Sequence, residues 1–441
     1  MQSAAAQGSD SSRTLGPDSA AGSAVATLEA RIRHLDSAVA KLSQGRGASA
    51  PEVGLSGQGL SVRSADGRFG ITLRGYFQSD ARAPLGESAE SFQRGFVLRR
   101  VRPVWQANVG TLVELRLMPD FGGSAPTIYD AHMDLKFSKS FNVRSGKFKP
   151  PVGFERLQSA TDLTFIERAH PTSLAPNRDI GVQLYGDIDR LRLSYALGVF
   201  NGVPDIGFAE SDADRFKDVS ARVQVEPLRG RESLWPGELI LGLAASRGEH
   251  RGTPSNPQLQ TYRSPLQESF FRFRGDGTPA GTTVADGQQH RVAPHGYLSL
   301  GRVGMLGEYT RSEQGVRRSG SYATLANRAT NLTATWLLTG ERASYRGVTP
   351  LRPFDPMRGR YGAFEVAGRF STLTVDRDAF PFFADPQTQA RDARTAGAAI
   401  NWYLSRGVRL MLDYTLTRYR GSGSIDPPAE RALSSRFQFS F

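Results

Sequence analysis

Apolar and polar residues alternate along most of the chain from about residue 68 onward. The segment TIYDAHMDLKF (127–137) places Tyr, Ala, Met, Leu and Phe on one side and Asp, His, Asp and Lys on the other. The same period of two recurs in 191–200 and 431–441. Because successive side chains of a β-strand point to opposite faces, each segment has one apolar and one polar face. The pattern predicts a protein built mainly from amphipathic strands.

The alternating segments number about sixteen, and an even number is typical of bacterial transmembrane barrels. We therefore predict an all-β fold, a transmembrane antiparallel β-barrel with a short N-terminal periplasmic helix or coiled coil. The predicted strands are 68–78, 93–107, 111–118, 127–137, 141–148, 180–187, 191–200, 216–226, 238–246, 289–300, 304–312, 323–339, 360–370, 393–403, 408–419 and 431–441.

The connections between these strands sort by length. One alternate set is short: 108–110, 138–140, 188–190, 301–303 and 404–407. The other set is long: 79–92, 119–126, 149–179, 201–215, 247–288, 371–392 and 420–430. A barrel threaded through a membrane has tight turns on its periplasmic side and long loops outside, whereas a soluble sandwich has no reason for such sorting. Two longer turns, 227–237 and 340–359, interrupt the short set.

The N-terminal region follows different patterns. Residues 1–22 are rich in Ser, Ala and Gly, and we expect them to be disordered. Residues 23–44 carry apolar residues at heptad spacing, which indicates either a short oligomerising coiled coil or a lone amphipathic helix. A linker (45–60) then precedes the barrel (61–441). The first ten residues, MQSAAAQGSD, lack the apolar core of a signal peptide, and the strand pattern favours a mature form from which a signal has been removed.

Composition narrows the possible functions. The chain of 441 residues contains no cysteine, which excludes disulfides, thiolate metal sites and cysteine nucleophiles. Its net charge of +12 would usually suggest nucleic acid. The basic residues, however, lie singly within strand-like segments, with no basic helix or finger spacing. We therefore expect small anions as partners and no nucleic acid, metal or cofactor.

Several pieces of the sequence resemble a known family. The stretch VRSGKFKPPVGFERLQSATDLTFIERAHPTSLAPNRDIGVQLYG (143–186) looks like the hallmark segment of the phosphate-selective porin O/P family. Further matching pieces, in the family's order, are GFVLRRVRP (95–103), LRLMPDFG (115–122), WLLTGE (336–341), GAFEVAGRFS (362–371) and AGAAINWYLSRGVRLMLDYT (396–415).

The resemblance covers most of residues 60–441. It implies a trimeric, sixteen-stranded barrel in the outer membrane, surrounded by lipid, that conducts anions such as phosphate. It also implies that the connection 149–179 folds into the barrel and narrows the pore. Arg156, Arg168 and one of Arg99 and Arg100 would then occupy the positions that form the constriction.

Basic residues on the polar strand faces are the candidate pore lining, because guanidinium groups bind phosphate oxygens in pairs and rings of Arg or Lys select anions. For each single residue, an ordinary solvated lumen charge is an equally good interpretation. Arg99 and Arg100 are adjacent, so both can face the lumen only across a β-bulge or at a strand end. Asp120 either orients an arginine or is an ordinary loop residue. The candidates are Arg74, Arg99, Arg100, Arg116, Lys147, Lys149, Arg156, Arg168, Arg178, Arg192, Arg222 and Asp120.

Three other functions remain open. A weakly selective general porin needs no special arginine arrangement. A barrel enzyme could use Asp130, His132 and Asp134, which share one strand face, although a polar lumen stripe explains them more simply. No motif of a serine hydrolase, zinc protease or P-loop enzyme is present. A surface binding protein would produce no channel conductance.

Overall fold

A computed structural model describes residues 27, 29–37, 50–56, 59–86, 95–123, 125–208, 211, 212, 214–230, 237–423 and 426–441. The segment 1–22, predicted to be disordered, lies outside the described residues, as do parts of the predicted helix and linker.

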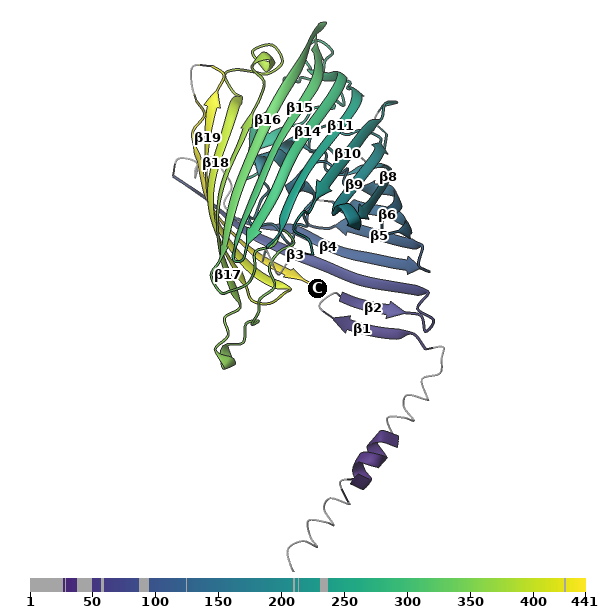
Figure 1. Ribbon diagram of the computed structural model, residues 1–441. Coiled ribbons are helices and arrows are strands. Elements are labelled where there is room, and N and C mark those ends of the chain that lie inside the picture. Colours follow the sequence, from purple (N-terminus) through teal and green to yellow (C-terminus); the bar gives the residue numbers. More distant parts are fainter. Residues whose placement is uncertain are drawn as a thin grey trace, which may run out of the picture.

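In the described residues, sixteen antiparallel strands close into a barrel, which confirms the predicted fold class. Each strand pairs with its neighbour in sequence, and the last strand pairs with the first from Arg431 opposite Leu85 to Ser440 opposite Tyr76. Figure 1 shows the tilted strands forming one continuous wall. The barrel strands are β3 (Phe69–Leu85), β4 (Gly95–Val109), β5 (Val113–Asp120), β6 (Thr127–Ser138), β7 (Phe141–Phe148), β8 (Asp179–Ile188), β9 (Leu193–Phe200), β10 (Asp218–Val225), β11 (Leu239–Arg251), β14 (Val284–Leu300), β15 (Val303–Arg318), β16 (Ser321–Leu337), β17 (Ala363–Thr374), β18 (Ala390–Tyr403), β19 (Val408–Gly421) and β20 (Glu430–Ser440).

Each of the sixteen predicted segments corresponds to one of these strands. The largest differences are at the long-loop ends, where β3, β11, β14 and β15 continue beyond their predicted limits. These extensions carry polar residues that pair with equally long neighbours, such as the ladder from Val303–Trp336 to Arg318–Ser321. Strand pairing needs only backbone partners and does not need apolar side chains that face lipid. The alternation of apolar and polar residues therefore ends before the strands do.

The alternation places apolar side chains outside and polar ones inside. On β5, Leu115 and Leu117 are each 42% exposed on the outer wall. On β18, Ile400 is 51% exposed, while the neighbouring Asn401 is fully buried. A barrel in water would not leave such a band of leucine, valine and phenylalanine exposed, whereas lipid satisfies it.

A β-hairpin occupies residues where the sequence suggested only a linker and the barrel's start. Its strands are β1 (Glu52–Ser56) and β2 (Gly59–Arg63). β2 pairs with β3 from Leu60 opposite Leu73 to Arg63 opposite Gly70. It thus continues the edge of the sheet below the C-terminus, where Phe441 and Gly75 exchange backbone hydrogen bonds of 3.0 and 3.1 Å. Each of these two strands has only five residues, so each offers few alternating positions from which the sequence could predict it.

The described part of the N-terminal region is helical over residues 29–37 and exposed throughout, as expected for part of the predicted helix. Its apolar residues Ile32 and Leu35 are 56% and 60% exposed. Among the described helices, none is both long enough and apolar enough to cross a membrane.

Two long connections fold into the barrel. The first, between β7 and β8, contains α3 (Phe154–Leu157) and the short 3-10 turn η1 (His170–Leu174). The second, between β11 and β14, contains β12 (Tyr262–Arg263) and β13 (Ser269–Phe271). An apolar cluster joins Phe271, Leu325 and Leu373 to Leu174 of the first connection. The remaining 3-10 turns are η2 (Asp189–Leu191), η3 (Pro356–Arg358) and η4 (Arg377–Ala379).

Candidate anion-binding constriction

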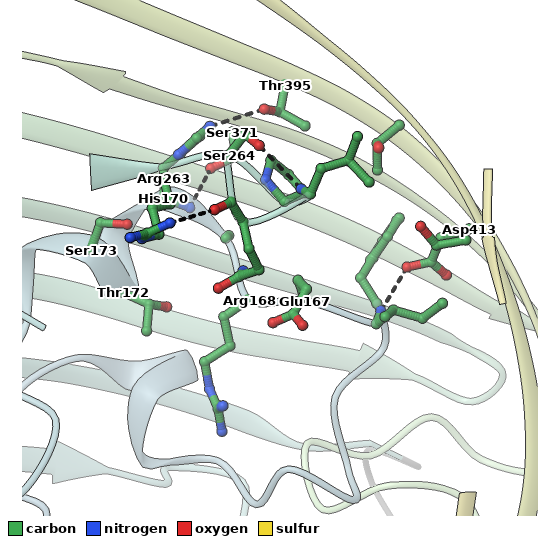
Figure 2. Close-up of a pocket in the computed structure, with 18 of the residues that line it drawn as sticks. Glu167, Arg168, His170, Thr172, Ser173, Arg263, Ser264, Ser371, Thr395 and Asp413 are labelled. Atoms are coloured by element: carbon green, nitrogen blue, oxygen red, sulfur yellow. Dashed lines mark hydrogen bonds between the residues drawn. The ribbon is translucent and has the colours of Figure 1, made fainter. Parts of the chain in front are cut away.

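The connection 149–178 crosses the lumen and is fastened to the opposite wall. The Ile166 backbone N–H donates to the Asp413 carboxylate at 2.6 Å, and Arg409 donates to the Leu163 carbonyl at 2.7 Å. His170 Nε2 lies 2.9 Å from the Thr395 hydroxyl (Figure 2). These contacts fasten the loop to β18 and β19. This inward fold is what the family resemblance implied.

Two cavities lie on either side of this loop, one of about 330 Å³ and one of about 770 Å³. Arg102, Arg168 and Arg178 line both of them. We call these three residues the throat arginines, because they mark the place where the two cavities adjoin. Figure 2 shows Arg168 with Glu167, His170 and Thr172 of the loop along the first cavity. Any solute that passes from one cavity to the other therefore meets three guanidinium groups.

Two of the throat arginines are held in place by carboxylates and one aromatic ring. Arg102 lies 2.7 Å from Asp120, and Arg178 lies 3.2 Å from Asp130. The ring of Tyr129 lies between them, 3.8 Å from the Arg102 guanidinium carbon and 4.7 Å from that of Arg178. Such cation–π contacts and ion pairs fix the two side chains while leaving donors directed at the cavities.

The third throat arginine has no carboxylate partner among the described residues. Arg168 donates to the backbone carbonyls of Glu155 at 3.0 Å and Gln158 at 2.8 Å. Burial, opposed by Glu155 and reinforced by Arg178 and Arg102, lowers its pKa to about 10. The group therefore carries a full positive charge at neutral pH, and it lines both cavities.

Two further loop cations share this property. In the described structure, Lys149 donates only to the carbonyls of Leu157 and Gln158, and Arg156 only to that of Thr172. Burial and then the charge of Arg178 hold the pKa of Lys149 well below its ordinary value. Positive groups crowded together in this way are unfavourable alone, and a negative solute between them removes the repulsion.

Arg99 and Arg100 both face the lumen, and of the two predicted explanations, a β-bulge or a strand end, the structure contains the bulge. On β3 the ladder passes from Gln78 opposite Arg100 directly to Ser79 opposite Leu98, so Arg99 is the extra residue. Asp120 supports the bulge, because its carboxylate accepts the Val101 backbone N–H at 3.1 Å. The predicted constriction role fits them less well, since both turn toward a carboxylate of the loop.

That carboxylate is Glu167. Arg99 binds it with two hydrogen bonds of 2.6 and 3.1 Å, and the other contacts come from Arg82 at 3.2 Å, Arg100 at 3.8 Å and Arg436 at 3.8 Å. Arg436 also binds Asp80 through two hydrogen bonds of 2.6 and 2.8 Å. We call these four arginines with Asp80 and Glu167 the Glu167 cluster. Burial raises the pKa of Glu167, but Arg99 and Arg100 outweigh burial and hold it well below its ordinary value.

The other predicted residues divide into two groups. Arg116 and Arg222 line the larger cavity, and Arg74 lines a third cavity of about 380 Å³ toward the short-turn end. Lys147 and Arg192 line none of these three cavities. The Lys147 ammonium nitrogen lies 3.8 Å from the ring centre of Phe208. Arg192 ends the turn η2 in a left-handed conformation, so the strand alternation that placed it in the lumen does not extend to it.

Sequence reasoning missed four residues that the structure brings to the site: Arg82, Arg102, Tyr129 and Arg436. Arg102 and Arg436 follow the alternation of their strands, so the pattern itself indicates that both side chains face the lumen. The alternation predicts that the first barrel strand ends at residue 78, which puts Arg82 in a loop. It also predicts that Tyr129 lies on the apolar face, and a register shift between Met118 and Pro119 lies beside this residue.

The family model for phosphate-selective porin O and P matches residues 69–230 and 279–441. The chain belongs to this porin family. No curated protein sequence matches this chain. Solved structures that are similar to it in fold include the following three, each at 10–11% sequence identity.

The outer membrane channel DcaP of Acinetobacter baumannii has 10% identity and a TM-score of 0.52, with 85% of this chain and 97% of that chain covered. The anion-selective porin from Comamonas acidovorans has 11% identity and a TM-score of 0.50, covering 85% and 100%. OmpT of Vibrio cholerae in its trimer form has 10% identity and a TM-score of 0.50, covering 85% and 99%. At such identities these likenesses support the barrel fold and nothing finer.

Membership of this porin family points to a channel rather than an enzyme. The residues that could have suggested a catalytic site are used in ion pairs along the lumen: Asp130 with Arg178, and Asp134 with Arg144 at 2.8 Å. His132 lies 3.3 Å from Asp134. Within the described residues, no group of three or more His, Cys, Asp or Glu side chains converges as a metal site would require.

Proposed function

We propose that this outer-membrane porin conducts small anions and that the throat arginines give it its preference. The single observation that carries the proposal is that Arg102, Arg168 and Arg178 line both cavities, with Arg168 free of any carboxylate among the described residues. A ring of cationic side chains at a narrow point attracts anions and repels cations. The anion-selective porin from Comamonas acidovorans, which shares the fold, is consistent with this function.

Phosphate or polyphosphate is the proposed solute. Guanidinium groups present planar pairs of N–H donors that match two phosphate oxygens. The throat offers such groups from β4, from the loop and from the residue preceding β8, so one phosphate could contact several of them in succession. Conduction requires that each contact be weak enough for release, and donors shared among several sites satisfy that requirement.

Planar-bilayer recording tests the proposal. We expect stepwise channels in potassium chloride, a reversal potential in a salt gradient that indicates anion preference, and reduced chloride current when phosphate is added at millimolar concentration. Cation preference in the gradient would contradict the anion proposal. Chloride current that is insensitive to phosphate would contradict phosphate as the solute while leaving anion conduction intact.

A weakly selective anion porin is the second candidate, and one observation favours it. Arg99 and Arg100, which the family resemblance implied for the constriction, are turned toward Glu167. A carboxylate at this position reduces the positive charge available to a passing anion. Comparable permeabilities for chloride, acetate and phosphate would identify this second function.

We further propose that the protein is a homotrimer whose short turns and N-terminal helix face the periplasm. The trimer form of OmpT shares the barrel fold, and the heptad spacing within 23–44 would suit an oligomerising coiled coil. Light scattering in detergent, with and without residues 1–44, would test this assembly. A monomer in both cases would contradict it.

A further inference from the structure

One connection on the short-turn side is long and projects beyond the strand ends. It joins β16 to β17, and its outer part, residues 350–361, contains η3. We call residues 350–361 the rim segment. In Figure 1 it is the green trace below β17, reaching further from the barrel than the neighbouring turns at that end. Neither the conduction path nor the Glu167 cluster uses it.

The rim segment is attached to the outer, lipid-facing wall. Trp402 of β18 lies on the same face as Ile400, which is 51% exposed, while Asn401 points inward. The Phe354 ring contacts Trp402 edge-on at 5.6 Å, and Trp402 Nε1 donates to the Tyr361 carbonyl at 2.6 Å. The segment is therefore held at the end of the apolar wall and away from the lumen, at the level where the hydrocarbon of a bilayer gives way to headgroups.

Its exposed side chains combine positive charge with apolar surface. Arg352, Arg358 and Arg360 are exposed, and Asp355 pairs with Arg358 at 3.5 Å. Arg352 and Arg360 have no carboxylate partner among the described residues. Leu351 is 72% exposed and Tyr361 is 64% exposed. In an aqueous space, this apolar surface would be left without partners.

We propose that the rim segment binds the headgroup phosphates of anionic phospholipids in the adjacent leaflet. Guanidinium groups bind phosphate through paired hydrogen bonds, and basic residues beside a bilayer are attracted to anionic lipid. Tryptophan and tyrosine prefer the membrane interface, where an apolar ring and a polar group are both satisfied. Trp402 and Tyr361 would mark this depth, with Arg352 and Arg360 just beyond it. The proposal is independent of the solute that the pore conducts.

The test uses the full-length protein in nanodiscs of phosphatidylcholine, with phosphatidylglycerol replacing up to half of the lipid. The Arg352→Gln/Arg360→Gln variant is compared with Arg68→Gln/Arg190→Gln, which removes two exposed arginines from other turns at the same end. We expect anionic lipid to raise the unfolding temperature of the wild type and of the control variant. The rim variant should lose most of this increase and should retain fewer phosphatidylglycerol molecules in native mass spectrometry.

Single-channel conductance should be the same in all three proteins, which separates this test from that of the proposed function. An Arg352→Lys/Arg360→Lys variant should recover part of the lipid response, because charge is kept and only the paired donors are lost. Equal lipid responses in the rim and control variants would overturn the proposal. Cross-links from a Met357→Cys variant to a second copy of the chain, with none to lipid, would overturn it in favour of a protein contact.

Discussion

The throat arginines and the Glu167 cluster both place arginine side chains in the lumen, and Glu167 and Arg168 are neighbours in sequence. The two groups nevertheless differ in what neutralises the positive charge. Around Glu167, four arginines share two carboxylates, and Arg436 and Asp80 are both fully buried. At the throat, Arg168 meets only backbone carbonyls. The same side chain therefore fastens the loop in one place and presents charge to the solute in the other. Counting basic residues in the lumen cannot distinguish these roles, because the partner of each residue decides its role.

The largest effect should come from breaking the buried part of the Glu167 cluster. Arg436→Met leaves Asp80 charged, buried and without its main partner, which typically costs about 3–5 kcal/mol. We expect the variant to unfold at a markedly lower temperature, measured by the heat-dependent shift of the folded barrel on a gel. If its stability equalled that of the wild type, the proposed fastening role of the cluster would be wrong.

Removing the throat charge should instead change selectivity with little effect on stability. Arg168→Gln takes away the one throat cation that has no carboxylate partner in the described structure. We expect the anion-to-cation permeability ratio to fall about tenfold, which corresponds to roughly 1.4 kcal/mol. Reversal potentials in a salt gradient measure the ratio. Arg192→Gln is the matched control, because Arg192 lies in a turn and lines none of the three cavities, and it should leave the ratio unchanged.

Removing the carboxylate of Glu167 makes the Glu167 cluster resemble the throat, where Arg168 has no carboxylate partner in the described structure. Glu167→Gln keeps the shape of the loop residue and removes its negative charge, so Glu167 no longer neutralises the positive charges of Arg99 and Arg100. We expect phosphate to block chloride current at a concentration several-fold lower than in the wild type. An unchanged blocking concentration in a correctly folded variant would show that these two arginines lie beyond the reach of the solute.

The smallest expected effect concerns pH. The pKa of Lys149 is lowered by burial and by Arg178, so its charge is lost as pH rises toward the ordinary lysine value of about 10.4. Anion preference should therefore decline modestly as pH rises, and the decline should occur at a lower pH than an ordinary lysine would give. Lys149→Met should abolish this decline. Lys139→Met, which removes an exposed lysine paired with Asp189, should preserve it.

The amino-acid sequence alone determined the barrel, its strand number and the face of most side chains. Alternation is a local property of each strand, so it can be followed without knowing the neighbours. Local reasoning also left two ways for Arg99 and Arg100 both to face the lumen, a bulge or a strand end, and the ladder contains the bulge. Local reasoning failed at two places. Arg192 lies in the turn before β9 and not in the strand, and β3 continues to Leu85 although the alternating pattern ends earlier.

Only the tertiary structure decided which arginines are available to a solute. Glu167 lies 68 residues from Arg99 and far along the chain from Arg436, so nothing in the local sequence shows that they meet. The loop 149–178 had to cross the lumen and contact β17–β20 before Glu167 could gather its four arginines. An ion pair depends on a few ångströms between atoms, and only the closed barrel sets those distances. For this reason the sequence predicted a cationic pore, while the fold assigned each cation its role.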